Sequence, residues 1–223
     1  MSFARCRKLN RAFYERDPLL VCKDMLGKVI VRQIGHCRMT GEIVETEAYV
    51  GPYDKASHAY GNKRTNRTMV QFGERGHAYV FRVYGVYNCF CAVVGPPCIP
   101  AVVLVRAVKP LEGSKLMRRN RNLGDDVPIH KLTNGPSKFC QAFEITDELN
   151  GTNLTGHKLF LCEGQQSLFE IATSARIGID YADEYKDVYW RFYKSDDIFV
   201  SRNRSVRYSK PPESFHERTR KRL

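Results

Sequence analysis

The chain has 223 residues, of which 43% are hydrophobic and 27% are charged. This length and composition are typical of one folded, soluble domain rather than of a disordered chain. No apolar run approaches the roughly 18 residues that a membrane-spanning helix needs. The first residues, Met1 to Arg5, lack the apolar core of a signal peptide. We therefore expect a protein that is neither secreted nor held in a membrane.

The net charge of +12 points to a polyanion as the partner. Each Lys or Arg beside a phosphate releases condensed counterions, so a strongly basic chain gains affinity for nucleic acid. An acidic membrane is the alternative, but it favours a basic amphipathic helix, and no segment has a convincing pattern of that kind. Nucleic acid is the expected partner.

Eight cysteines allow either disulfides or free thiols. Several lie within apolar runs and no secretory signal precedes them, so we expect buried free thiols in a reducing compartment. Cys89-Phe90-Cys91 lacks the spacing of a zinc knuckle, and no second Cys/His pair completes a tetrahedral site, so no metal is expected. The eight are Cys6, Cys22, Cys37, Cys89, Cys91, Cys98, Cys140 and Cys162.

The first half of the chain begins with a helix and continues with strands. Residues 17–27 have helical apolar spacing, with Asp17 as N-cap, Pro18 in the first turn and Gly27 as the terminator. Strand-like runs follow. They are expected at 28–33 and 40–49, with a turn at 51–54 and a long polar loop at 55–78, which is typical of a functional or mobile connection.

Residues 79–94 form the densest β-forming stretch, interrupted only by Tyr84-Gly85, which predicts a hairpin tip. No βαβ period, Gly-x-Gly-x-x-Gly motif or phosphate-binding loop is present, so no nucleotide cofactor is expected. The remaining expected elements are a strand at 101–108, a helix at 110–120, a polar loop at 120–134, a helix at 137–143, and short strands at 159–161 and 190–193.

Glu45, Glu47 and Tyr49 would share one face of a strand over residues 40–49, because side chains alternate. Two like charges on one face repel, so the face is either a solvated edge strand or a functional site. Periodicity alone does not choose between the two glutamates. Arg106 lies within an apolar strand and needs a carboxylate partner such as Glu47, in a functional site or a structural ion pair.

Two further residues can be interpreted either as ordinary structural residues or as functional ones. His58 is either an ordinary surface histidine or a site residue. Tyr84, at the expected hairpin tip, has little core to pack against, and an exposed aromatic on a basic protein can stack on bases or wedge between them. The last residues are basic, which fits a disordered tail, a localisation signal or a phosphate contact.

The order and spacing of several short segments resemble the alkyladenine DNA glycosylase family, also called methylpurine glycosylases. The resemblance runs from about Phe13 to about Arg202 and leaves 203–223 as a basic C-terminal tail of a single domain, residues 1–223. No single segment is specific for the family, but the order and spacing of the segments together are. They are GEIVETEAY at 41–49, GP at 51–52, ASH at 56–58, GHAYV at 76–80, YGVY at 84–87, LVRAVKPLEG at 104–113, GPSKFCQA at 135–142 and ARIGI at 175–179.

The resemblance implies a single compact α/β (α+β) domain, with a curved, mostly antiparallel sheet and a protruding β-hairpin. It also implies a monofunctional repair enzyme that flips a damaged purine from double-stranded DNA and hydrolyses its N-glycosidic bond. The lesions it implies are alkylated purines such as 3-methyladenine and 7-methylguanine, hypoxanthine and ethenoadenine. We expect a monomer without cofactor, located in the nucleus if the source is eukaryotic and otherwise in the cytoplasm or nucleoid.

The resemblance also implies the role of each site residue. Glu47 matches the general base that activates water, while Arg106 and the backbone carbonyl of Ile177 help to hold that water. Tyr84 matches the wedge that fills the gap left by the flipped nucleotide. The others are two pocket residues, Tyr49 and His58, a stacking position at which Phe81 replaces the family's tyrosine, and a phosphate-proximal lysine, Lys138. On this basis Glu47→Gln should lose excision, whereas Glu45→Gln should not.

Cys91 is the main departure, because the family usually has Asn there, at the border of the pocket, and that Asn is thought to disfavour guanine. A thiol is smaller and a much weaker hydrogen-bonding group. We therefore expect weaker discrimination against guanine lesions. Two other classes remain as alternatives: a catalytically impaired nucleic-acid-binding protein, and a metal-dependent nuclease that uses Glu45 and Glu47 as ligands.

Overall fold

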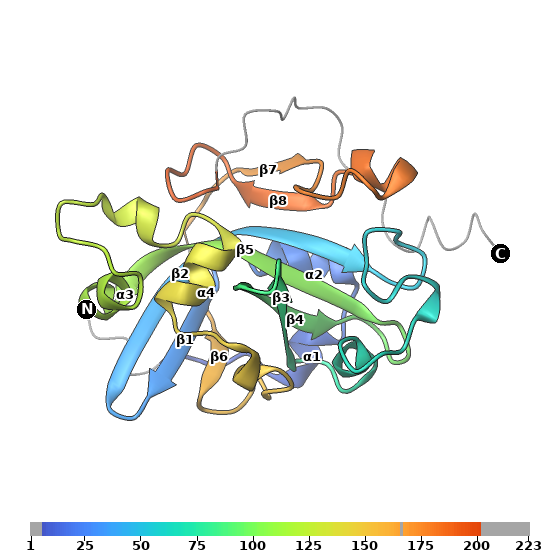
Figure 1. Cartoon of the computed structure of the whole chain (residues 1–223), viewed down its shortest axis with the longest axis horizontal. Helices are drawn as coiled ribbons and strands as arrows, with labels where there is room; N and C mark the ends of the chain where they lie inside the picture. The colour runs from blue at the N-terminus through green and yellow to red at the C-terminus, as the bar shows by residue number, and fades with distance from the viewer. Residues whose placement is uncertain (1–5, 166, 202–223) are drawn as a thin grey trace.

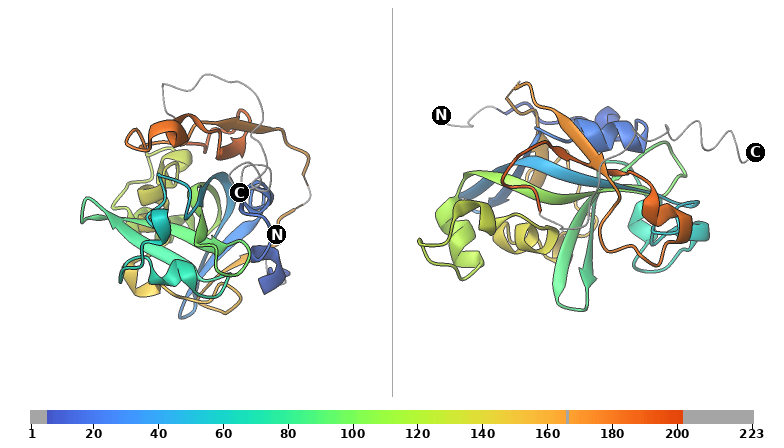
Figure 2. Two further views of the ribbon diagram at one scale, coloured as in Figure 1. Left: turned by 90° about the vertical axis from the view of Figure 1, so that its right-hand side faces the viewer. Right: turned by 90° about the horizontal axis from the view of Figure 1, so that it is seen from above.

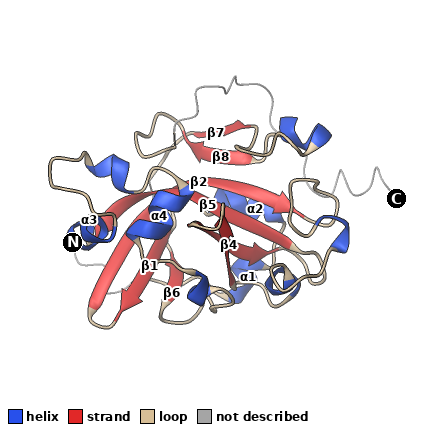
Figure 3. Ribbon diagram, in the orientation of Figure 1, coloured by secondary structure: helices blue, strands red, loops and turns tan. Residues whose placement is uncertain are grey.

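The computed structural model describes residues 6–165 and 167–201, and the expected basic tail lies outside them. Its centre is one sheet in which every pairing is antiparallel, with the strand order β3-β4-β5-β2-β1-β6, while β8 pairs with β2 and β7 with β8 (Figures 1 and 3). The fold class expected from the sequence is confirmed. The strands are β1 (Val29–Ile34), β2 (Cys37–Val50), β3 (Ala78–Val83), β4 (Tyr87–Val94), β5 (Ala101–Glu112), β6 (Leu159–Cys162), β7 (Ile171–Ser174) and β8 (Arg191–Lys194).

Short helices cover the sheet on both sides. α2 packs on β2 and β5, whereas α4 packs on β4 and β5. Figure 2, right panel, shows α1 and α2 in blue on the opposite side of the sheet from α3 and α4 in yellow-green. The α-helices are α1 (Arg11–Tyr14), α2 (Pro18–Asp24), α3 (Ser114–Asn120) and α4 (Pro136–Ala142), and the 3₁₀ turns are η1 (Tyr60–Asn62), η2 (Met69–Phe72), η3 (Ile129–Leu132), η4 (Asp147–Leu149) and η5 (Asp183–Asp187).

Helix α2 begins where the sequence predicted but ends at Asp24, before the predicted terminator Gly27. The Asp17 carboxylate accepts hydrogen bonds from the N–H groups of Leu19 and Leu20, which would otherwise lack a partner, and Pro18 occupies the first position. Gly27 follows with φ +81°, a conformation that glycine adopts without strain. No helix in the described residues is long and apolar enough to cross a bilayer.

The strand at 40–49 is not at an edge, so the edge-strand interpretation of its two glutamates is wrong. As β2 it runs to 14 residues and lies between β5 and β1, and β8 also pairs with its Glu45–Glu47 segment. The register against β5 shifts on both sides of Glu45, which marks a β-bulge. Both glutamates are therefore enclosed at the centre of the sheet.

The helix expected over 110–120 is also partly wrong, because β5 continues to Glu112 and α3 begins only at Ser114. A proline cannot donate to a strand ladder and is tolerated where pairing is irregular. Pro110 pairs with Gly41 at such a place, because the register shifts between Thr40 and Gly41. The sequence also gave no sign of α1 or β7, which are only four residues long.

One cysteine pair corrects the expectation of free thiols. The N-terminal segment runs beside β6, with the Leu9 N–H bonded to the Leu161 carbonyl, and it brings Cys6 within 5.7 Å of Cys162 between Cα atoms, where the two form a disulfide. The other six cysteines are free, and four of them are buried.

The β3–β4 hairpin extends away from the sheet, as both panels of Figure 2 show. Tyr84 and Gly85 have φ of +53° and +71°, and positive φ at both central residues is what a type I′ hairpin turn requires. The Val86 N–H donates to the Val83 carbonyl and closes the turn. The hairpin tip predicted from the sequence is therefore confirmed.

A substitution at Phe139 tests whether the core contributes more to the free energy of unfolding than the hairpin tip does. The side chain is fully buried on α4, with Phe143 at 5.0 Å and Phe90 at 6.3 Å between ring centroids. Phe139→Ala should lower the free energy of unfolding by about 3–5 kcal/mol, because it removes apolar burial and leaves a cavity. Tyr84→Ala, at a side chain that is 90% exposed, should change it by less than about 0.5 kcal/mol. Urea unfolding measures both, and equal losses would contradict this assignment of the core.

Candidate active site

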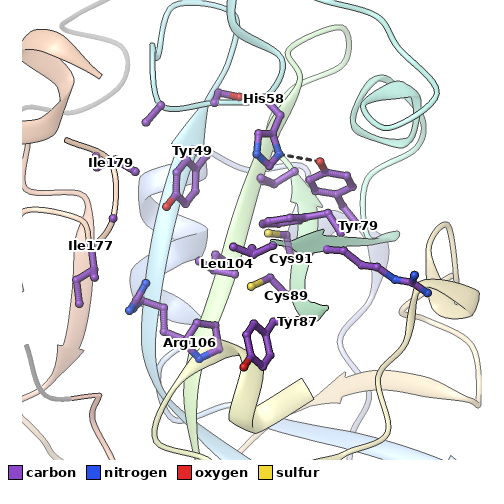
Figure 4. A pocket seen from close by; sticks show the side chains of 18 of the residues that line it. Tyr49, His58, Tyr79, Tyr87, Cys89, Cys91, Leu104, Arg106, Ile177 and Ile179 are labelled. Atoms are coloured by element: carbon purple, nitrogen blue, oxygen red, sulfur yellow. Dashed lines mark hydrogen bonds between the residues drawn. The ribbon is translucent and has the colours of Figure 1, made fainter. Parts of the chain in front are cut away.

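A cavity of about 520 Å³ opens between the β3–β4 hairpin, the central strands β2 and β5, and the segment 177–181 (Figure 4). This volume lies in the range of small-molecule sites and suits a single base. Seven residues singled out from the sequence line it: Tyr49, His58, Phe81, Tyr84, Cys91, Arg106 and Ile177. The fold thus brings together residues that lie up to 128 positions apart in the chain.

Glu47 lies directly behind the wall of this cavity, with no exposed surface. Its Oε2 accepts a hydrogen bond from the Tyr49 hydroxyl at 2.9 Å, and its Oε1 accepts from the Ile177 backbone N–H at 2.9 Å. The Arg106 Nη1 lies 3.2 Å from the same Oε1. All three partner residues line the cavity, so Glu47 contacts its wall from behind (Figure 4 labels the three partners).

Arg106 contacts both glutamates of β2. Its Nε donates to the Glu45 Oε1 at 2.8 Å, while its Nη1 reaches Glu47. Burial alone would lower the pKa of the Arg106 guanidinium, but the two carboxylates outweigh it and raise that pKa above its usual range. The sequence suggested Glu47 as the partner of Arg106; the structure shows that Glu45 is the closer one. The expectation that Glu45→Gln spares the reaction is therefore revised.

Tyr49 keeps its hydroxyl proton. Burial, together with the adjacent Glu47 carboxylate, raises the pKa of this phenol well above its usual value. It therefore remains a hydrogen-bond donor to Glu47, and its ring remains part of the cavity wall. The Arg176 guanidinium lies 4.7 Å from the centre of the same ring.

Arg176 and Asp54 form a fully buried ion pair that sequence analysis did not identify. The Arg176 Nη2 donates to the Asp54 Oδ1 at 2.9 Å, and its Nη1 also donates to the Ala48 carbonyl at 2.8 Å. Buried charges are tolerated when they are paired and hydrogen-bonded. The pair ties the segment that carries Ile177 to the turn after β2, which places the Ile177 N–H on Glu47.

The opposite wall is aromatic and centres on His58. Its Nδ1 lies 2.8 Å from the Tyr79 hydroxyl, and its Nε2 lies 3.2 Å from the Arg67 guanidinium. Because an arginine only donates, Nε2 accepts and the Nδ1–H donates to Tyr79. Tyr79 stacks on Phe81, with centroids 5.2 Å apart. Sequence analysis gave Tyr79 and Arg67 no role.

Cys91 and Cys89 project from β4 into the cavity (Figure 4). Cys91 pairs with Tyr79 on β3 and with Leu104 on β5, so its position is fixed by the sheet on both sides. Burial raises the pKa of the Cys91 thiol well above its usual value, and the group presented to a ligand is therefore a neutral thiol.

Two predicted residues lie at or beyond the rim. Tyr84 is 90% exposed and reaches the mouth of the cavity from the hairpin tip. Lys138 is exposed on α4 and does not line the cavity, although its neighbours Pro136 and Ser137 do. Its Nζ donates to the Asn134 side chain at 3.0 Å, and partial burial together with Arg121 and Lys131 lowers its pKa.

Taken together, the arrangement is that of an enzyme that acts on DNA: a basic protein with an exposed aromatic side chain beside a cavity, which has aromatic walls and a buried carboxylate behind it. Among the described residues, no cluster of three or more His, Cys, Asp or Glu side chains is arranged to hold a metal ion.

Comparison with known proteins gives the family. The family model described as methylpurine-DNA glycosylase (MPG) matches residues 12–198. A "putative 3-methyladenine DNA glycosylase" of Desulfitobacterium hafniense is 47% identical over 200 residues, covering 87% of this chain and 98% of the relative. Another of the same description, from Clostridium acetobutylicum, is 48% identical over 199 residues, covering 87% of this chain and 97% of the relative. The chain belongs to the methylpurine-DNA glycosylase family and is an enzyme of that family, as its sequence segments indicated.

His58 should make stability depend on pH. Burial and the nearby Arg67 lower the pKa of His58 from 6.5 to about 4. The unfolded chain therefore binds a proton at higher pH than the folded chain, and the free energy of unfolding should fall as the pH drops from 6.5 towards 4. His58→Gln should remove that part of the decline, whereas His36→Gln, in the exposed β1–β2 turn, should not. Urea unfolding at several pH values measures the difference; identical slopes for wild type and His58→Gln would contradict it.

Proposed function

We propose that this enzyme excises damaged purines from duplex DNA as a monofunctional glycosylase that starts base excision repair. The observation that carries the proposal is the position of Glu47, a buried carboxylate directly behind a base-sized cavity with Tyr84 at its mouth. Extruding a nucleotide costs a few kcal/mol, least for damaged or mispaired bases, and this difference supplies part of the selectivity.

The cavity walls suit a flipped purine. The base would stack against Tyr49 and Phe81, with the neutral His58 contacting its edge or the sugar, while Tyr84 fills the gap in the duplex. Alkylated purines are electron-poor, so they stack well on electron-rich rings. They are also good leaving groups, because a cationic base departs as a neutral molecule.

Glu47 then acts as the general base. Water attacks C1′ of the sugar, its proton passes to Glu47, and the bond from C1′ to the purine breaks with its electron pair leaving on the base. The carboxylate also stabilises the positive charge that develops on the sugar. Because Glu47 has no exposed surface, water reaches it only when one lining partner shifts; Tyr49, against which the base would stack, is the one we propose.

Arg106 and the Ile177 carbonyl would orient this water, with Lys138 near a phosphate. No amine nucleophile takes part, so the product is an intact abasic site. The range we propose is 3-methyladenine, 7-methylguanine, hypoxanthine and ethenoadenine. The enzyme would act as a monomer that needs no metal or cofactor, and residues 1–223 would form a single domain with a basic C-terminal tail at 203–223.

A panel of duplexes, each with one lesion, tests the activity. After incubation with the enzyme, hot alkali should break the strand at the lesion site. Samples that are incubated with the enzyme but receive no alkali should keep an intact strand. EDTA should leave the result unchanged. Absence of excision at every lesion would favour a DNA-binding protein without activity, and EDTA-sensitive cleavage of undamaged DNA would favour a nuclease.

Glu47→Gln should keep duplex binding and lower the single-turnover excision rate by about 10²–10⁴-fold, the usual contribution of a general base. The glutamine retains the shape of the side chain but cannot take the proton. Glu148→Gln, at an exposed position, serves as the matched control. Excision that survives in Glu47→Gln would remove the base assignment.

Tyr84→Ser should weaken capture of the flipped state by roughly 10- to 100-fold, because stacking of one aromatic is worth about 1–3 kcal/mol. Stopped-flow fluorescence of an ethenoadenine duplex reports the flipped population directly. Tyr53→Ser, at an exposed tyrosine outside the cavity, is the control. A flipping signal unchanged in Tyr84→Ser would count against the wedge.

Cys91→Asn should lower excision of 7-methylguanine relative to hypoxanthine, by roughly tenfold if the added side chain blocks the exocyclic amine of guanine. Cys91→Ala separates the loss of the thiol from the gain of the amide and should keep the wild-type preference. The measurement is the ratio of single-turnover rates on the two lesions. Equal ratios in wild type and Cys91→Asn would show that position 91 does not set this preference.

A further inference from the structure

Glu45 is a second carboxylate beside the site, and the proposed reaction gives it no role. It has no exposed surface, and it contacts the same arginine as Glu47. Burying a carboxylate is costly unless its oxygens are fully paired. The partners of Glu45 therefore indicate what it contributes.

Four donors hold the Glu45 carboxylate. Its Oε1 accepts from the Nε of Arg106 at 2.8 Å, the Nε of Arg191 at 2.7 Å and the hydroxyl of Ser201 at 2.8 Å. Its Oε2 accepts from the Ser201 backbone N–H at 2.6 Å. The donors come from β5, from β8 and from the segment after β8, so the carboxylate is fixed from three sides.

Arg191 is held in turn by other groups. Its Nη1 donates to the Ser174 hydroxyl at 2.9 Å and its Nη2 donates to the Ser201 carbonyl at 3.1 Å. Its backbone pairs with Glu47 in the β2–β8 ladder, but among the described residues its guanidinium forms an ion pair with Glu45 and not with Glu47, so its charge acts on the site through Glu45. Two carboxylates and two guanidiniums thus form one buried group with balanced charge.

Arg106 is divided between the two glutamates. A guanidinium is planar and rigid, so a bond that holds Nε also fixes where Nη1 points. With Nε on Glu45, Arg106 gives Glu47 one contact at 3.2 Å instead of the two parallel bonds that an arginine and a carboxylate commonly form.

We infer that Glu45 is a positioning residue for excision: it holds one edge of Arg106, so that Glu47 keeps a single longer arginine contact and remains able to accept a proton. The inference rests on the proposed role of Glu47. Without the charge at position 45, Arg106 can turn to form two bonds with Glu47. A carboxylate paired in that way is a weaker base.

Several charged or titratable groups on the elements packed around Glu47 lie close enough to interact with it electrostatically. β2 contributes Tyr49, the segment after β7 contributes Arg176, α2 contributes Cys22, and β4 contributes Cys89 and Cys91. None of these groups changes in the variants below, so a shift in the pH profile reports on the Glu45–Arg106–Arg191 group.

Two variants move the charge of this group in opposite directions. Glu45→Gln removes the carboxylate that holds Arg106, whereas Arg191→Gln leaves Arg106 as the only cation paired with Glu45 among the described residues. Single-turnover excision of a hypoxanthine duplex is measured between about pH 5 and 9. Glu45→Gln should lower the rate about 10- to 100-fold near neutral pH and move the acid limb of the profile to lower pH. Arg191→Gln should move the acid limb to higher pH.

Binding and folding controls separate positioning from damage to the fold. Circular dichroism and thermal melting identify the folded variants, and duplex affinity should stay within about twofold of wild type. Glu45→Asp, which keeps the charge, should recover most of the rate and the wild-type profile. If Glu45→Gln does not fold, the direction of the Arg191→Gln shift still decides the question.

The outcomes separate this inference from the proposed function. Wild-type protein that excises no lesion overturns both. Wild-type excision that is lost in Glu47→Gln, with profiles for Glu45→Gln and Arg191→Gln that match wild type or shift in the same direction, overturns only the role of Glu45.

Discussion

The structure depends on a buried group of four charges at the centre of its sheet. Glu45 and Glu47 come from β2, while Arg106 and Arg191 come from β5 and β8, which pair with this part of β2. An unpaired buried charge is costly, so each of the four is stabilised by its oppositely charged partners. The strands that form the back of the cavity are therefore held in register by the same charges that would carry out the reaction.

The group also explains why the sheet is irregular where it is. The register of β2 against β5 shifts on both sides of Glu45, and β8 pairs with β2 only over Glu45–Glu47. A bulge changes the direction of a side chain and increases the local twist. Here it lets the strand present two carboxylates to one guanidinium while β8 supplies the second cation.

The sequence predicted the local features of the site because these depend on neighbours along the chain. Alternation placed Glu45, Glu47 and Tyr49 together, and Tyr84-Gly85 predicted the hairpin tip. The resemblance supplied the rest of the cavity lining. The burial of the two glutamates could not be predicted from the sequence. A strand with two acids suggested a solvated sheet edge, whereas in the structure the pairing of residues 191–193 with residues 45–47 encloses this part of the strand.

The residues that sequence analysis missed share one property, which is that their partners are distant in the chain. Arg176 meets Asp54 across 122 positions, and Tyr79 meets His58 across 21. Each lay in or near a segment that carried the family resemblance, but neither pairing follows from composition or spacing. Cys6 and Cys162, 156 positions apart, show the same limit in the N-terminal segment.

General affinity for DNA and the proposed excision chemistry depend on different charges in this molecule. The net charge of +12 gives the chain a general attraction to phosphates, a property of the chain's overall charge that carries no information about lesions. The buried group beside the cavity, in contrast, has two carboxylates balanced by two guanidiniums. A balanced group does not by itself attract or repel a neutral or cationic base strongly, so in the proposed reaction selection among bases would depend on the shape of the cavity and on its lining, the aromatic walls and Cys91 included. The same balance leaves one carboxylate close to the point where positive charge would develop on the sugar, where a fixed charge in a dry site has its largest effect.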